Sequence, residues 1–159
     1  MSIMESTMNQ QDWKQVAEIE LVYKTKVKAS ERPEIGEAKD AARLLMSLWN
    51  EGKIDFVEQV RVLLLNRANR VLGVVEISSG GVTGTIADPK LIFSAALKAN
   101  ACGIIISHNH PSGNIRPSRA DEQLTSKIKE GGKYLDIKLL DHIIVTSEGY
   151  YSFAEQGLL

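Results

Sequence analysis

Two histidines and one aspartate in the second half of the chain could bind a metal ion. His108 and His110 follow the apolar run 103–107, and side chains two positions apart in an extended chain point to the same side. Asp121 follows after a loop-length interval, so its carboxylate could return to the two imidazoles. Two nitrogens and one oxygen, with a fourth position left for water, are typical of catalytic zinc. The sequence therefore predicts a Zn²⁺ site held by His108, His110 and Asp121.

Asp121 also fits an interpretation that needs no metal. Ser118, three positions before it and ahead of a helical pattern, is typical of the N-cap of a capping box. The two interpretations are compatible, because a place in the first helical turn would fix the direction of the Asp121 side chain. Both therefore stay open at the level of the sequence.

The order His-x-His-Pro, Ser118, Asp121 resembles the JAMM motif of the MPN (Mov34/JAB) metalloprotease-like superfamily. Flanking segments narrow the resemblance to the bacterial RadC-like proteins, namely 63–66, 103–110, 111–114, 117–121 and 140–144. The resemblance covers residues 16–159, and the polar residues 1–15 are expected to form a flexible tail. RadC-like proteins carry an N-terminal helix-hairpin-helix module, which this chain is expected to lack.

The resemblance implies a role for each site residue. His108, His110 and Asp121 would hold zinc, Ser118 would support the reacting oxyanion, and Glu76 would activate the attacking water. The alternative for Glu76 is a solvent-facing position on an alternating strand. Glu58 is its nearest competitor for the water-activating role, but it precedes the predicted strand.

The implied reaction is cleavage of an amide or isopeptide bond in a peptide or protein substrate. The interval between Glu76 and His108 leaves little room for the insertions with which deubiquitinating relatives hold ubiquitin, so a ubiquitin-type substrate is not supported. A DNA-repair-associated binding module with a structural zinc, or with none, is the main alternative. A nuclease has thinner support, because the ligand set lacks additional carboxylates.

The periodicity of apolar residues predicts one α/β (α+β) domain, and the resemblance implies an MPN/JAB-like (cytidine-deaminase-like) fold with a mixed, curved sheet flanked by helices. We expect strands over 18–28, 60–65, 71–78, 82–86, 103–107, 139–146 and 150–153. Helices are expected over 38–49, 89–99 and 119–130, the last ended by Gly131 and Gly132.

Composition excludes several classes of protein. With 19 basic and 20 acidic residues the net charge is -1, so there is no basic surplus for nucleic acid, and binding to it is expected to be weak. No apolar run approaches the roughly 20 residues that span a bilayer, and no signal peptide is evident. The single cysteine permits no internal disulfide, which favours the reducing cytoplasm.

Four other residues near these motifs have open roles. His142 could lie behind a metal ligand, contact substrate, or simply be hydrogen-bonded within the sheet. Cys102 is expected to be a small buried apolar residue rather than a nucleophile. Arg116 and Arg119 flank Ser118 and could bind an anionic substrate, although arginines on a loop are more often solvated.

Overall fold

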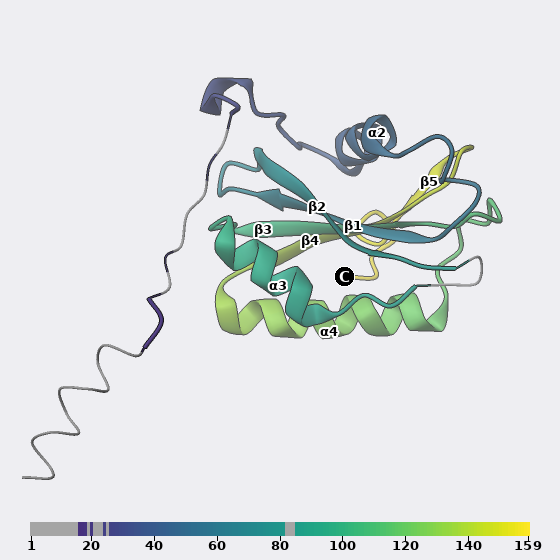
Figure 1. The fold of residues 1–159 in the computed structure, drawn as a ribbon. Coiled ribbons are helices and arrows are strands. Elements are labelled where there is room, and N and C mark those ends of the chain that lie inside the picture. Colours follow the sequence, from purple (N-terminus) through teal and green to yellow (C-terminus); the bar gives the residue numbers. More distant parts are fainter. Residues whose placement is uncertain (1–15, 19, 21–23, 25, 82–84) are drawn as a thin grey trace, which may run out of the picture.

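Five strands form a mixed sheet in the order β2-β1-β3-β4-β5 within the part of the chain that the structure describes (Figure 1). The structure is a computed structural model, and it describes residues 16–18, 20, 24, 26–81 and 85–159. The strands are β1 (Gln59–Leu65), β2 (Val71–Ser79), β3 (Gly103–Asn109), β4 (Lys138–Val145) and β5 (Tyr150–Ser152). The helices are α2 (Ala38–Leu48), α3 (Pro89–Lys98) and α4 (Arg119–Leu135), and Ala29–Glu31 is a 3-10 turn. The predicted mixed α/β architecture is confirmed.

The pairing directions place the end of β3 beside the start of α4. β1 pairs antiparallel with both β2 and β3, whereas β3 and β4 run parallel. A parallel pair needs a long crossover, and α4 supplies it. The crossover leaves the sheet at the carboxyl end of β3, which is where open α/β sheets usually bind their ligands.

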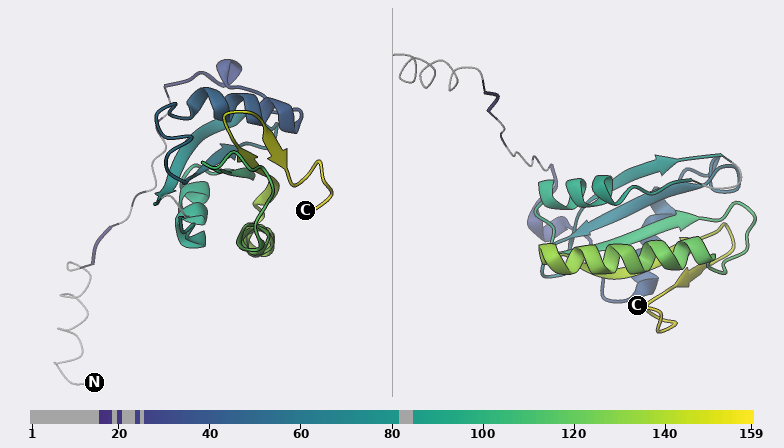
Figure 2. Two further views of the ribbon diagram at one scale, coloured as in Figure 1. Left: turned by 90° about the vertical axis from the view of Figure 1, so that its right-hand side faces the viewer. Right: turned by 90° about the horizontal axis from the view of Figure 1, so that it is seen from below.

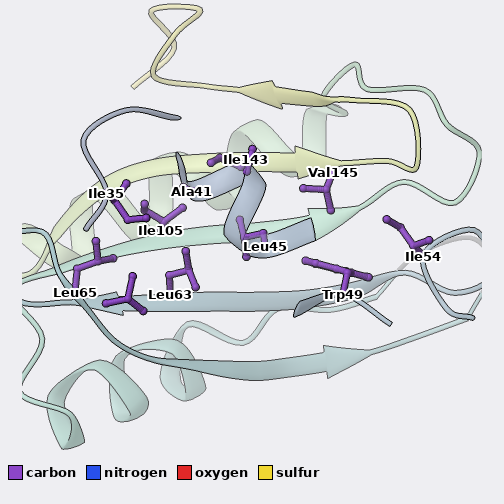
Figure 3. Close-up of a cluster of buried hydrophobic side chains, with 12 residues drawn as sticks. Ile35, Ala41, Leu45, Trp49, Ile54, Leu63, Leu65, Ile105, Ile143 and Val145 are labelled. Atoms are coloured by element: carbon purple, nitrogen blue, oxygen red, sulfur yellow. The ribbon is translucent and has the colours of Figure 1, made fainter. Parts of the chain in front are cut away.

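Helices cover both faces of the sheet and bury two separate cores. α2 lies on one face, and α3 and α4 lie side by side on the other (Figures 1 and 2). β1 divides its side chains by parity, since Leu63 and Leu65 pack toward α2 while Val62 and Leu64 pack toward α3 and α4. Figure 3 shows the core beneath α2. The parity of a residue on β1 or β3 therefore decides which helical layer it meets.

Local sequence signals account for most helix boundaries. Asp88 caps α3 by accepting a hydrogen bond from the backbone of Lys90, with Pro89 at the first helical position. The expected end of α4 at Glu130 is wrong, because the helix continues through two glycines to Leu135 and ends at Asp136, whose φ is 54°.

Tertiary packing explains why these glycines do not end α4. A Cβ at Gly131 would lie 2.9 Å from the Phe93 ring of α3, and one at Gly132 would lie 2.1 Å from the Ile137 carbonyl oxygen. The glycines therefore permit close approach within a continuous helix rather than a left-handed stop.

Three further expectations concern the flanks of these elements. Cys102 is exposed, so its expected burial is wrong, because the buried part of β3 begins only at the next residue. The predicted strand over 18–28 includes residues 19, 21–23 and 25, and the one over 82–86 includes 82–84, all outside the described residues. Both strands stay predictions.

No described helix is long and apolar enough to cross a membrane.

Candidate metal centre

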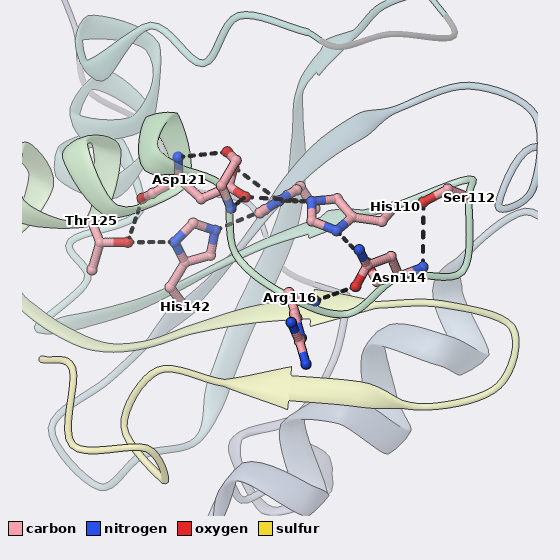
Figure 4. A network of polar contacts seen from close by, with 9 residues as sticks. His110, Ser112, Asn114, Arg116, Asp121, Thr125 and His142 are labelled. Atoms are coloured by element: carbon pink, nitrogen blue, oxygen red, sulfur yellow. Dashed lines mark hydrogen bonds and ion pairs between the residues drawn. The ribbon is translucent and has the colours of Figure 1, made fainter.

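Four side chains from three segments of the chain converge at the carboxyl end of β3. Glu58, His108, His110 and Asp121 each offer one ligand atom, and these atoms lie within 4.8 Å of one another. Glu58 comes from the residue before β1, the histidines from the end of β3, and Asp121 from the first turn of α4. Figure 4 shows His110 and Asp121 with the polar contacts around them. The three residues predicted as metal ligands are thus brought together, with one carboxylate in addition.

β3 and the loop after it orient the two imidazoles. His108 is the last but one residue of β3 and is buried, whereas His110 begins the loop and is partly exposed. The Nδ1 of His110 lies 2.6 Å from the carbonyl oxygen of Asn114, which can only accept, so this nitrogen carries the proton. The Nε2 atoms of His108 and His110 lie 3.0 Å apart. A neutral His110 therefore presents an unprotonated Nε2 to the cluster.

The Asp121 carboxylate serves the helix cap and the cluster at once. Its Oδ2 accepts from the backbone of Ser118 at 2.7 Å, and the Ser118 hydroxyl accepts from the backbone of Asp121 at 3.1 Å, which completes a capping box. Its Oδ1 lies 3.2 Å from His108 Nε2, and its Oδ2 lies 3.4 Å from His110 Nε2. The capping box fixes the carboxylate in the direction that faces the histidines.

The electrostatics of the cluster favour a bound cation. Burial by itself raises the pKa of the Asp121 carboxyl, but the neighbouring imidazoles of His108 and His110 outweigh it and hold this pKa well below its usual range. The adjacent Asp121 carboxylate raises the pKa of His110. Asp121 is therefore ionised, and its carboxylate faces the two imidazole nitrogens.

Comparison with known proteins gives a consistent family. The sequence pattern of the RadC-like JAB domain matches residues 35–158. The chain belongs to the RadC-like JAB family. A UPF0758 protein of Flavobacterium johnsoniae is 44% identical over 124 residues, covering 78% of this chain and 53% of the relative. UPF0758 proteins of Chlorobaculum parvum and Porphyromonas gingivalis are each 44% identical, over 64% of this chain and 46% and 45% of theirs. The chain spans about half the length of these relatives.

Glu76 lies on the other face of the sheet from the histidines of this RadC-like JAB domain. Glu76 pairs with Arg61 on β1, and Arg61 stacks over Trp49 on the α2 side. The carboxylate accepts from Gln59 Nε2 at 2.7 Å, lies 3.8 Å from Arg61, and is 47% exposed. The resemblance implied that Glu76 would lie at the cluster, and the structure does not bring it there.

Glu58 is the carboxylate from the β1 side that lies near the two histidines. Glu58 has the same parity as Val60, which lies opposite His108 in the β1–β3 pairing. Burial raises the pKa of the Glu58 carboxyl, nearby His108 and His110 lower it, and the Asp121 carboxylate raises it, so that the overall shift is upward. The sequence indicates that Glu58 and Val60 point to the same face of the sheet. Only the pairing register of β1 with β3 shows that His108 points to that face too.

Asn109 holds the Glu58 segment against β3. Its side chain is fully buried on the α2 side, accepts from the backbone N–H of Gln59 at 2.7 Å, and donates to the carbonyls of Ile54 and Val57 at 2.7 and 2.8 Å. The Asn109 side chain thus lies on the opposite face of β3 from its neighbour His108. These hydrogen bonds fix the backbone on both sides of Glu58.

We expect Asn109→Ala to lower the free energy of unfolding by about 2 to 4 kcal/mol, because it leaves buried backbone groups of Ile54, Val57 and Gln59 without partners. Urea denaturation would measure the change. Asn114→Ala is the control, since this exposed side chain accepts a single backbone hydrogen bond. Similar stability for the two variants would contradict the clamping role.

A surface pocket of about 700 Å³ opens onto the cluster. Its lining includes Glu58, His110, Ser118 and Asp121, together with Ile86 and Arg116. Ser118 is exposed there, so its hydroxyl hydrogen can point into the pocket while its oxygen accepts from Asp121. Arg119 is exposed but does not belong to this lining. The pocket gives a substrate access to the ligand atoms from one side.

Proposed function

We propose that this chain is a zinc-dependent metallohydrolase of JAMM type that cleaves an amide or isopeptide bond in a peptide or protein. The observation that carries the proposal is the spacing of the donor atoms. His108 Nε2 lies 3.0 Å from His110 Nε2 and 3.2 Å from Asp121 Oδ1, and His110 Nε2 lies 3.4 Å from Asp121 Oδ2. Ligands at about 2.0–2.1 Å from a tetrahedral zinc are separated from one another by roughly 3.3 Å. The donor set therefore fits the ion in both chemistry and size.

The type of donor favours zinc over other biological cations. Mg²⁺ and Ca²⁺ prefer sites made of oxygen atoms, whereas imidazole suits zinc and related transition metals. Zinc bound here would lower the pKa of water and polarise a carbonyl group. His108, His110 and Asp121 would hold the ion, and a fourth ligand position would be left for water.

The remaining site residues have roles set by their positions. Glu58 lies within 4.8 Å of the ligand atoms, so its carboxylate can take a proton from the attacking water and return it to the departing amine nitrogen. The Ser118 hydroxyl lines the same pocket and can donate to an oxyanion. A reducing, cytoplasmic setting is part of this proposal, because the chain has one cysteine.

The proposal is tested by the metal content of protein purified without added zinc. We expect about one zinc per chain, because the described residues offer one such ligand set. His108→Ala and His110→Ala should each lose it, while Glu130→Ala, at an exposed carboxylate on α4, should keep it. Elemental analysis by mass spectrometry measures the content. Equal zinc in all these proteins would place the metal elsewhere.

A nucleic-acid-binding module remains the second candidate function. A hollow of about 760 Å³ is lined by Arg67, Lys129, Lys133 and Lys138, with Asp136 as its acidic member. Such a group could contact phosphates, but Lys133 is already paired with Glu130 at 2.8 Å, and the overall net charge is -1. These charges favour at most weak, salt-sensitive binding.

A further inference from the structure

A chain of buried hydrogen bonds connects His108 to the backbone of Asp121 behind the candidate metal centre. His108 Nδ1 lies 2.8 Å from His142 Nε2, His142 Nδ1 lies 2.6 Å from Thr125 Oγ1, and Thr125 Oγ1 donates to the Asp121 carbonyl oxygen at 2.8 Å. His108, His142 and Thr125 are each at most 3% exposed. Figure 4 shows the dashed contacts that join Asp121 to Thr125 and Thr125 to His142. This series of hydrogen bonds therefore begins at one candidate ligand, His108, and ends at the backbone of another, Asp121.

The last hydrogen bond determines the direction of the others. A backbone carbonyl can only accept, so Thr125 donates its single hydroxyl proton to the Asp121 carbonyl oxygen. Thr125 must then accept from His142 Nδ1, and a neutral His142 has an unprotonated Nε2 left to accept from His108 Nδ1. His108 consequently has an unprotonated Nε2, which is the nitrogen that faces Asp121 and His110.

The surroundings of His142 keep its ring in place. Phe153 stacks on the ring with a centroid distance of 4.7 Å and an interplanar angle of 9°, and its backbone N–H donates to the His142 carbonyl at 3.0 Å. A charged His142 would be fully buried, and its Nε2–H would face the protonated Nδ1 of His108. The packing thus favours a neutral ring in one orientation.

We propose that His142 and Thr125 are positioning residues that set the tautomer of His108, so that its Nε2 is available as a metal ligand. This inference rests on the proposed function, because it assigns the metal to His108 Nε2. The Asp121 carboxylate, 3.2 Å away, competes by attracting a proton to that nitrogen. If His108 carried its proton on Nε2, each of these side-chain hydrogen bonds would run in the opposite direction. Thr125 would then donate to His142 and lose its hydrogen bond with Asp121.

Substitutions at Thr125 test the role of the acceptor. Thr125→Val has nearly the same shape but cannot accept from His142, so it should weaken zinc binding by about 10- to 100-fold, as is usual for residues that orient a ligand. Thr125→Ser keeps the hydroxyl and should bind zinc like the wild type. Competition with a chromophoric chelator measures the affinities, and thermal melting of the metal-free proteins checks folding. Equal affinities of the two folded variants would overturn the proposal.

The tautomer itself can be observed without metal. Long-range ¹H–¹⁵N correlation spectra of metal-free wild-type protein, near pH 8 where histidine is ordinarily neutral, separate the ring nitrogens of the three histidines. We expect His108 and His142 to be protonated at Nδ1, and the same state in Thr125→Ser. His108 protonated at Nε2 in the wild type would overturn the proposal. A wild-type protein that binds no zinc would contradict the proposed function, whereas its His108 tautomer would still decide this inference.

Discussion

Asp121→Asn is expected to lower zinc affinity by more than about 100-fold while leaving the fold nearly as stable. This loss of affinity is larger than the usual effect of losing a residue that only orients a ligand. The amide oxygen can still accept from the Ser118 backbone, so the capping box loses little. The negative charge between His108 and His110 is lost, however, and a neutral amide is a poor zinc ligand. Chelator competition and thermal melting would measure the two effects separately.

Ser118→Ala is the matched control for this prediction. It removes the oxygen that accepts from the Asp121 backbone, which should cost about 0.5 to 2 kcal/mol of stability, as for other N-caps. The carboxylate of Asp121 stays, so zinc binding should be largely kept. The two variants therefore separate helix capping from metal binding. If Asp121→Asn binds zinc as tightly as the wild type, Asp121 is a capping residue only.

The convergence of His108, His110 and Asp121 could be predicted because each position depends on local geometry. His108 and His110 follow an apolar strand at a spacing that places both on one side, and β3 continues to Asn109 as this requires. Asp121 depends on the capping box, which the structure contains. Short-range rules of strands and helix starts were sufficient here, since no partner strand had to be known.

Glu58 and Glu76 differ in a property that short-range rules do not contain. Parity along β1 separates residues into two faces, but it does not say which face is shared with His108. That assignment comes from the β1–β3 register, in which Val60 lies opposite His108, and from the pairing of Glu76 with Arg61. A long-range register is set by the packing of the whole sheet.

The roles of His142 and the α4 glycines depend on tertiary packing in the same way. His142 meets His108 because β4 pairs with β3 so that Ile106 lies opposite His142. Gly131 and Gly132 match a helix stop in isolation, yet the nearby Phe93 and the Ile137 carbonyl require their small size within α4. In both cases the local sequence permits several outcomes and a distant contact selects one.

Glu58→Gln should reduce hydrolysis by roughly 100- to 10,000-fold, the usual contribution of a positioned general base. The amide has nearly the size and hydrogen-bonding capacity of the carboxylate, but it cannot take a proton from water. Zinc content and melting temperature should change little, because His108, His110 and Asp121 remain as ligands. A screen of peptide and isopeptide substrates comes first, followed by rates for a substrate that the wild type cleaves.

Glu76→Gln provides the same chemical change on the opposite face of the sheet. Its carboxylate interacts with Gln59 and Arg61 rather than with the cluster, so activity should stay near that of the wild type. Loss of activity in Glu76→Gln with full activity in Glu58→Gln would reverse the assignment and restore the role first predicted for Glu76. Loss of zinc in Glu58→Gln would instead make Glu58 a ligand. The pair of variants therefore distinguishes a group that moves protons from one that holds metal.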